Sequence, residues 1–383
     1  MYTVYQHWDP LKVCVVGRSY PPEFYSFIKN SKARTVMERI AQETEEDYQK
    51  LIALLEKFNV KILRPDIGDT IERYWTGSRY LPPPMTPRDY SAMIGNDFYI
   101  DYYPSWQYIQ DSWPQWRGKD WPINAPNNIM EFNQLPKLII DEIAKINPKF
   151  IRLINNNTWV KVIEEITPFA NVVLNRGVNS AITTRVGKDL YFGTENYNVD
   201  PLPLGKKYRN MFPDYRCHVI NTGGHADGTY CPVKPGLIVS LEDAPTYAAT
   251  FPDWEVVYLP AQSWDKVWPF LKLKRKNKGK WWVPGEELND EFTDFVEGWL
   301  NHWVGYVEET VFDVNMLVID EKNVVCNNYN KDVFDAFERH GVTPHVINFR
   351  HRYFWDGGLH CITSDVHREG VMKDYFPERI YNV

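Results

Sequence analysis

Apolar residues occur along this chain in short runs that alternate with longer amphipathic stretches. Residues 11–18 form an apolar run that ends near a glycine, which predicts a buried strand followed by a turn. Between residues 34 and 59, apolar side chains recur at helical spacing, as on the buried face of an amphipathic helix. Another apolar run begins at Val60. The chain is therefore predicted to open with a strand, a helix and a second strand.

A strand–turn–strand pattern then recurs, and each copy has a turn-forming residue at its bend. The copies are expected at residues 90–100, 180–192, around 234–239 and at 316–326. Helical patterns between several of them cover residues 135–146, 288–300 and 331–340, with Asp290 and Asp332 as expected N-terminal caps. The uneven spacing of the turns differs from the fixed period of a solenoid. It favours an α/β ring of ββαβ units that carry loop insertions.

Composition indicates a globular protein with a large core. Hydrophobic residues make up 44% of the 383 positions and charged residues 24%. The largest expected insertion, residues 101–134, is rich in Trp and Pro and lacks periodicity, so we expect an aromatic loop over one face. No break in composition separates two regions, and the chain is interpreted as a single domain, 1–383.

Charge and cysteine usage narrow the range of partners and locations. A net charge of −7 argues against a general nucleic-acid binder, and the one basic run, residues 272–280, is typical of a solvated loop. The five cysteines include no pair with the C-x-x-C spacing of a zinc or redox site, and their odd number in a long chain argues against a disulfide scaffold. Neither a signal peptide nor an apolar run of about 18 residues is visible. We therefore expect a cytoplasmic protein that does not enter membranes.

Two glycine-containing motifs carry the candidate chemistry. Residues 355–363 place Cys361 shortly after a glycine pair, where the backbone can approach a ligand closely. Residues 223–229 place His225 and Asp227 beside a second glycine pair. On one extended strand, His225 and Asp227 would point to the same face. We interpret Cys361 as a nucleophile, His225 as its acid/base partner and Asp227 as a clamp for a cationic substrate.

Two other interpretations of these residues stay open at this point. A free cysteine is among the most buried residue types and usually only packs. A zinc site is also conceivable from His225, Cys231, His360 and Cys361. It is disfavoured because the adjacent His360 and Cys361 would point apart in a strand.

Over nearly its whole length the chain resembles the amidinotransferases, close to the glycine amidinotransferase branch of the guanidino-group-modifying pentein superfamily. The segments that carry the resemblance are residues 8–18, 64–66, 87–89, 214–229 and 342–363. The paired His-x-Asp and Gly-Gly-x-His-Cys motifs are specific in combination and in order. The resemblance implies a five-bladed β/α propeller, a pseudo-fivefold ring with the site at its centre.

The resemblance also implies a set of roles. Asp89 and Asp227 would hold the planar, charged guanidinium of arginine by charge-assisted hydrogen bonds. The Cys361 thiolate would attack the central carbon and form an amidino-cysteine, which gives ping-pong kinetics. His225 would donate a proton to the leaving amine and take one from the incoming amine. Neither a metal nor an organic cofactor is required.

The chain departs from the family pattern at three places. Where the family has an aspartate that orients the catalytic histidine, our alignment gives Asn179, whose carbonyl can still accept the imidazole N–H. The arginine that receives the acceptor carboxylate falls near Ala244, and a serine pair falls on Glu308 and Glu309. Either the alignment slips in these loops, or the acceptor differs from ordinary glycine. Asn179 is assigned to the catalytic set, and Glu308 and Glu309 are assigned to substrate binding.

The leading hypothesis is an amidinotransferase that moves the amidino group of L-arginine to an amine. With glycine as acceptor, the products would be guanidinoacetate and ornithine. The alternatives are a hydrolase of arginine or another guanidino compound on the same scaffold, and a guanidino-compound binding protein with weak chemistry. The expected partners are small-molecule substrates, with no nucleic acid and no membrane, and a homodimer is left open.

Overall fold

The computed structural model describes residues 1–67, 82–100, 158–174, 178–194, 201–241, 247–263, 266, 283–300 and 313–379. The expected aromatic insertion, the helix at 135–146 and the basic run at 272–280 lie outside these residues. No helix in the described part of the chain has the length and apolar character needed to cross a membrane.

The described residues form five three-stranded sheets of one design. In each sheet the middle strand is antiparallel to one neighbour and parallel to the other. The sheets are β15 (Thr363–Arg368), β1 (Leu11–Val16) and β2 (Lys61–Leu63); β3 (Ser91–Ile94), β4 (Asp97–Ile100) and β5 (Asn171–Leu174); β6 (Thr183–Val186), β7 (Asp189–Thr194) and β8 (Arg216–Asn221); β9 (Tyr230–Lys234), β10 (Leu237–Ser240) and β11 (Glu255–Tyr258); and β12 (Leu317–Asp320), β13 (Asn323–Cys326) and β14 (Thr343–Val346).

The expected α/β class and the four strand–turn–strand elements are confirmed, because β3–β4, β6–β7, β9–β10 and β12–β13 are antiparallel pairs. A fifth pair joins the two ends of the chain. β1 runs antiparallel to β15, with Val16 opposite Thr363. The sequence pattern does not reveal this pairing, since its two strands are far apart in the chain.

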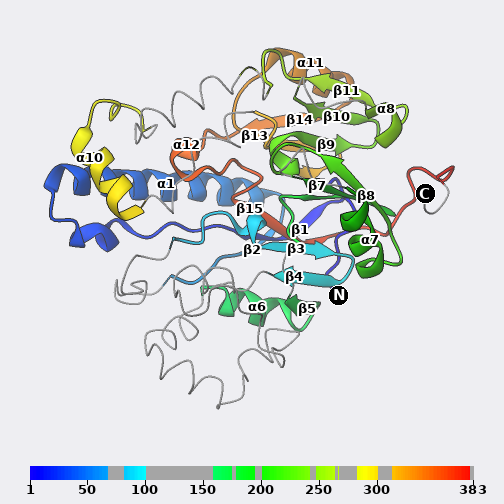
Figure 1. Ribbon diagram of the computed structural model, residues 1–383, viewed down its shortest axis with the longest axis horizontal. Coiled ribbons are helices and arrows are strands. Elements are labelled where there is room, and N and C mark those ends of the chain that lie inside the picture. The colour runs from blue at the N-terminus through cyan, green and yellow to red at the C-terminus, as the bar shows by residue number, and fades with distance from the viewer. Residues whose placement is uncertain are drawn as a thin grey trace.

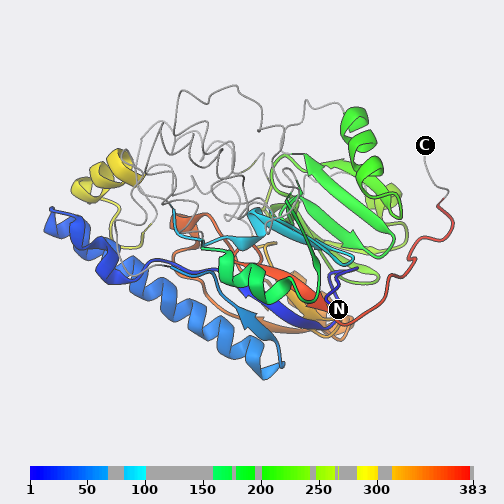
Figure 2. The ribbon, with the colours of Figure 1, turned by 90° about the horizontal axis from the view of Figure 1, so that it is seen from below.

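The long helix α1 (Ser31–Lys57) lies along one side of the molecule, with α10 (Asp290–Phe295) beside its N-terminal half (Figure 1). Asn30 caps α1, because its side chain accepts hydrogen bonds from the backbone of Lys32 and Ala33. The view from below shows α7 (Pro201–Met211) on the far side of the sheets from α1 (Figure 2). The other α-helices among the described residues are α6 (Val160–Ile166), α8 (Tyr247–Thr250), α11 (Lys331–Arg339) and α12 (Arg352–Trp355).

The predicted caps of two helices are wrong. Asn289 caps α10 through a hydrogen bond from Phe292 N, and Asn330 caps α11 through one from Val333 N. Asp290 lies one residue later and Asp332 two residues later, inside the first helical turn. A capping side chain must belong to a residue with non-helical backbone, and the asparagines occupy those positions.

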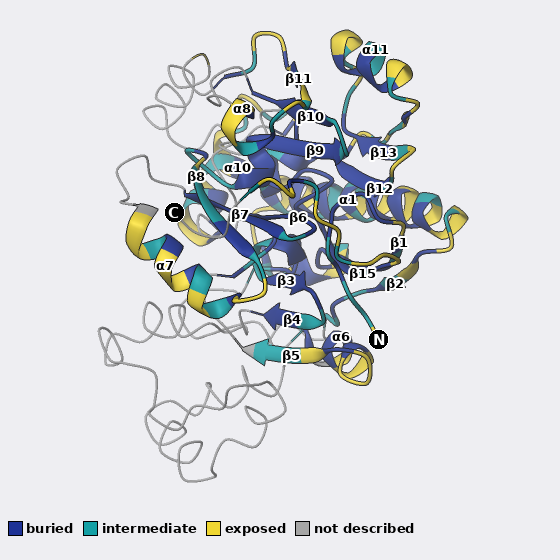
Figure 3. Cartoon of the chain, turned by 90° about the vertical axis from the view of Figure 1, so that its right-hand side faces the viewer, coloured by how far each residue is buried: buried dark blue, intermediate teal, exposed yellow. Residues whose placement is uncertain are grey.

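Most strand side chains are buried, while the outer faces of α7 and α11 are exposed (Figure 3). The strands β3, β6, β7 and β10 are buried at every position. Strands buried on both faces tend to read as apolar runs, as β10 does, whereas β6 is buried although three of its four residues are polar. The loops that lead into such strands are anchored by buried backbone. These loops carry the candidate site.

Candidate active site

Five polar residues occupy corresponding places in the five sheets. Each lies two to four residues before the first strand of an antiparallel pair, or before β15 in the pair that closes the chain. They are Asp89 before β3, Asn179 before β6, Asp227 before β9, Asn315 before β12 and Cys361 before β15. Residues distant in the sequence therefore occupy equivalent positions, one in each of the five sheets.

Hydrogen bonds join these five segments in a complete circuit. The links are Arg88 N to Cys361 O (3.4 Å), Ser180 N to Arg88 O (3.2 Å), Asp227 N to Ala181 O (3.1 Å), Asn315 Nδ2 to Asp227 O (3.3 Å) and Cys361 N to Asn315 Oδ1 (3.2 Å). Three links are between backbone groups, and the Asn315 side chain makes the other two. The circuit holds the candidate residues at one centre.

Cys361 is buried between two polar groups of opposite character. Its Sγ lies 3.0 Å from Nδ2 of Asn315, which is a donor, and 3.5 Å from Oδ2 of Asp227. The glycine pair before it meets protein atoms at close range. A Cβ on Gly358 would lie 2.5 Å from Oδ1 of Asn315, and one on Gly357 would lie 2.8 Å from Cγ2 of Thr86. Glycine at both positions therefore lets this loop pack against its neighbours.

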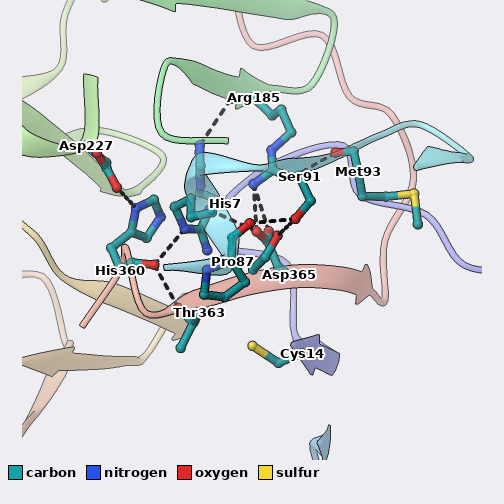
Figure 4. Close-up of polar contacts among 12 residues, drawn as sticks. His7, Cys14, Pro87, Ser91, Met93, Arg185, Asp227, His360, Thr363 and Asp365 are labelled. Atoms are coloured by element: carbon teal, nitrogen blue, oxygen red, sulfur yellow. Dashed lines mark hydrogen bonds and ion pairs between the residues drawn. The ribbon is translucent and has the colours of Figure 1, made fainter. Parts of the chain in front are cut away.

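Asp227 has a second close neighbour that the sequence analysis did not assign to it. Nδ1 of His360 lies 2.8 Å from Oδ2 of Asp227 (Figure 4). Burial, and then the nearby Arg88 guanidinium, lower the pKa of His360 to about 4. Its ring is therefore neutral at pH 7 and donates from Nδ1. Burial is the largest single influence and raises the pKa of Asp227, but the hydrogen bond from His360 and the charges of His360, His225 and Arg88 together outweigh it and hold that pKa below the usual value.

His225 and Asp89 face each other at the edge of the site. Nδ1 of His225 lies 3.8 Å from Oδ1 of Asp89, which is an ion-pair distance when the ring is protonated and is too long for a hydrogen bond. Burial raises the pKa of Asp89 to about 6, the charge of Asp227 adds to the rise, and His225 opposes it. Asp89 is thus a carboxyl group that titrates near neutral pH.

His225 and Asp227 do not lie on one extended strand, the arrangement that the sequence analysis considered. Residues Ala226–Gly228 make a 3-10 turn, and β9 begins only at Tyr230. The turn places Asp227 inside the buried centre, while His225 is 17% exposed. The two side chains reach the same site by this route and not by strand alternation.

The remaining predicted site residues have different outcomes. Oδ1 of Asn179 accepts a hydrogen bond from Ile182 N at 3.0 Å, a local contact at the start of β6. Its role as the partner of His225 stays a prediction. Glu308, Glu309 and Ala244 lie outside the described residues. Within the part of the chain that is described, no group of three or more His, Cys, Asp and Glu side chains is arranged to hold a metal ion.

A buried cluster of charges around Asp365 was missed by sequence reasoning (Figure 4). Asp365 pairs with Arg185 through two contacts of 2.8 and 2.9 Å, with Arg368 at 2.8 Å and with Arg88 at 3.1 Å. Nε of Arg88 also donates to the backbone oxygen of His360 at 2.7 Å. Three guanidinium groups face one carboxylate, so the cluster leaves net positive charge behind the nucleophile loop, which favours an anion such as a thiolate.

Comparisons with known proteins agree with the resemblance seen in the sequence. No protein-family model matches the chain. The mitochondrial glycine amidinotransferase of Xenopus tropicalis is 22% identical, over 97% of this chain and 84% of its own length. The L-arginine:L-lysine amidinotransferase of Pseudomonas savastanoi pv. phaseolicola is 20% identical, over 97% of this chain and 95% of its own.

Two solved structures have the same fold. SxtG, an amidinotransferase from Microseira wollei, and the inosamine-phosphate amidinotransferase StrB1 from Streptomyces griseus each give a TM-score of 0.57 at 15% identity. Each comparison covers 98% of this chain and 99% of the other. The resemblance to amidinotransferases is therefore confirmed, and it extends along almost the entire chain.

Proposed function

We propose that this chain is an amidinotransferase that takes the amidino group of L-arginine and passes it to an amine through a covalent amidino-Cys361. One observation carries the proposal. Sγ of Cys361 lies 3.5 Å from a buried carboxylate, Asp227, within a hydrogen-bonded circuit that also holds the segments of Asp89 and His225. The relative named L-arginine:L-lysine amidinotransferase supports the choice of donor.

The two carboxylates are suited to hold a guanidinium. Oδ1 of Asp227 and Oδ1 of Asp89 are both buried, and neither has a hydrogen-bond partner among the described residues. Buried carboxylate oxygens normally have partners, so these two suit a ligand rich in N–H donors. A guanidinium presents a planar fork of such donors and remains charged at neutral pH. Its central carbon would then lie within reach of Cys361.

The reaction follows from these positions. The Cys361 thiolate forms a bond to the central carbon, and the bond from that carbon to the ornithine nitrogen breaks as His225 protonates the leaving amine. The acceptor amine then attacks the same carbon and gives its proton to His225. The sulfur–carbon bond breaks and the thiolate is restored. With glycine as acceptor the product would be guanidinoacetate.

The more detailed expectations from the sequence, on the architecture, the supporting residues and the location, are part of the same proposal. The circuit of hydrogen bonds supports a closed five-bladed propeller, because it links the five sheets through equivalent positions. We retain a single domain over 1–383, Asn179 as a support for His225, and Glu308 and Glu309 as acceptor contacts. A cytoplasmic location and a homodimer stay expectations from the sequence.

Mass spectrometry tests the proposal directly. The protein is incubated with arginine, with and without amines such as glycine and lysine, and is then quenched in acid. We expect a gain of one amidino group on the Cys361 peptide, ornithine as the first product, and a new guanidino compound only when an amine is present. Cys361→Ala should abolish both steps, and Cys326→Ser, a change at a buried cysteine outside the circuit, should retain them.

Two results would overturn the assignment. An adduct on Cys14, Cys217, Cys231 or Cys326 would remove Cys361 from the role of nucleophile. Citrulline formed at the same rate with and without amines would assign the chain to the hydrolases on this scaffold.

A further inference from the structure

We propose that Asn315 acts on the nucleophile itself: its side-chain N–H donates a hydrogen bond that holds the Cys361 sulfur in place and stabilises its thiolate. This rests on the proposed function only in taking Cys361 as the nucleophile. No motif in the sequence marks Asn315, and it lies 46 positions before Cys361.

The orientation of the Asn315 amide is settled by its neighbours. Its Oδ1 lies 2.8 Å from His360 N and 3.2 Å from Cys361 N. Both of these backbone groups are donors only, so the oxygen of the amide must face them. The NH2 end then has to face the sulfur, 3.0 Å away. The group that faces the sulfur of Cys361 is therefore the NH2 donor of the amide. This holds even if the O and N atoms of the amide are interchanged at the outset.

The surroundings leave Asn315 little freedom to turn away. Its side chain has no exposed surface. Its backbone oxygen accepts a hydrogen bond from Nδ2 of Asn327 at 3.1 Å. Gly358 packs so closely against the amide that a Cβ there would lie 2.5 Å from Oδ1 of Asn315. A donor fixed in this way is in place before substrate arrives, which is the condition for stabilising a charge without reorganisation.

The two polar neighbours of the sulfur act in opposite directions. The Asp227 carboxylate accepts from a thiol S–H and repels a thiolate. The Asn315 amide donates, and a donor favours the ionised sulfur. Asn315 thus offsets the effect that the Asp227 carboxylate, which is needed to bind the guanidinium of arginine, has on the ionisation of the sulfur. Without the amide, Cys361 would keep a carboxylate neighbour and lose the neutral donor that offsets it.

Ultraviolet titration of the thiolate in the absence of substrate tests this, with Cys361→Ser as the blank. Loss of a hydrogen bond to a charged group corresponds to a rise of about 1 to 2 in the pKa of Cys361 for Asn315→Ala. Asn315→Asp is the sharper variant, because it has nearly the same shape and keeps an oxygen on the two backbone N–H groups. It replaces the NH2 donor with a carboxylate oxygen that only accepts and carries negative charge when ionised, so the pKa of Cys361 should rise at least as far as in Asn315→Ala.

Asn327→Ala is the matched control. It removes a buried amide that contacts the backbone of Asn315 and does not touch the sulfur. Its thermal stability should fall, and its Cys361 titration should match that of the parent. A Cys361 titration unchanged in Asn315→Asp would overturn the inference and leave Asn315 a purely structural residue. Because no substrate is present, this result is independent of whether arginine is the donor.

Discussion

Asp227 accepts a hydrogen bond from Nδ1 of His360 at 2.8 Å through Oδ2, the same oxygen that lies 3.5 Å from Sγ of Cys361. One oxygen of the carboxylate is therefore committed to the protein, and Oδ1 is left for a ligand. The residue beside the nucleophile thus fixes the rotation of the carboxylate that would hold the substrate. The Gly-Gly-x-His-Cys motif supplies two functions from adjacent residues.

The first prediction concerns this contact. His360→Leu removes the donor, so the Asp227 carboxylate should lose its fixed orientation and KM for arginine should rise. A hydrogen bond to a charged group is worth about 1.5–3 kcal/mol, or roughly tenfold to a hundredfold in affinity. His360→Asn is the control, because its side-chain N–H can occupy the place of Nδ1, and KM should be largely restored. Equal losses in steady-state kinetics for the two variants would contradict the role of the donor.

The second prediction is that Asp89→Asn weakens donor binding and yet stabilises the fold at pH 7. The fold raises the pKa of Asp89 from 3.8 to about 6. Between these values the folded state binds more protons than the unfolded state, so this carboxyl lowers stability as pH rises. Removing its charge should raise the free energy of unfolding at pH 7 by up to about 3 kcal/mol. The gain should vanish below about pH 4 in urea titrations.

Asp227→Asn is the matched control, and its sign is opposite. The fold lowers the pKa of Asp227, so its ionised form contributes stability above the unfolded value of 3.8, and this contribution is lost as pH falls through the folded pKa. The substitution should therefore destabilise the protein at pH 7. Arginine binding measured by calorimetry should weaken roughly tenfold to a hundredfold in both variants. Unchanged binding in both would exclude the clamp.

The third prediction concerns the charge cluster behind the site. Asp365→Asn leaves Arg88, Arg185 and Arg368 without their shared carboxylate, and all three are buried. Removing one partner from a buried ion pair costs about 3–5 kcal/mol. Ser364→Ala is the control, because it loses only a neutral hydrogen bond to Ser91, worth about 1 kcal/mol. Similar midpoints of urea unfolding for the two variants would show that the charge cluster does not stabilise the fold.

The local patterns in the sequence were enough to predict the repeated unit, but not how the units meet. Apolar runs and turn residues placed the antiparallel pairs, since these are set by neighbours in the chain. Asp365 and its three arginines come from distant segments, and no spacing in the sequence joins them. Asn315 had one usable signal, its place two residues before β12, as Asp89 stands before β3 and Cys361 before β15.

The last question is which group supports His225. Asn179 was predicted for this role, and its Oδ1 accepts a hydrogen bond from Ile182 N. Asp89 presents a carboxylate oxygen 3.8 Å from Nδ1 of His225. The two candidates differ in charge, because an amide can orient an imidazole while a carboxylate also favours its protonated form. The pH dependence of amidino transfer to the acceptor amine, the step in which His225 takes up a proton, separates them.

The fourth prediction is therefore a shift of the acidic limb in the pH–rate profile. If Asn179 reaches His225, Asn179→Asp should move the limb to higher pH, because a new carboxylate holds the proton on a ring that must be neutral to act as a base. Asn179→Ala should lower the rate by loss of orientation and leave the limb in place. If instead both variants keep the parent profile, and only Asn179→Ala loses about 0.5–1.5 kcal/mol of stability because Asn179→Asp keeps the oxygen that accepts from Ile182 N, Asn179 serves the turn before β6. The support of His225 would then fall to Asp89, whose own titration near pH 6 should disappear from the profile of Asp89→Asn.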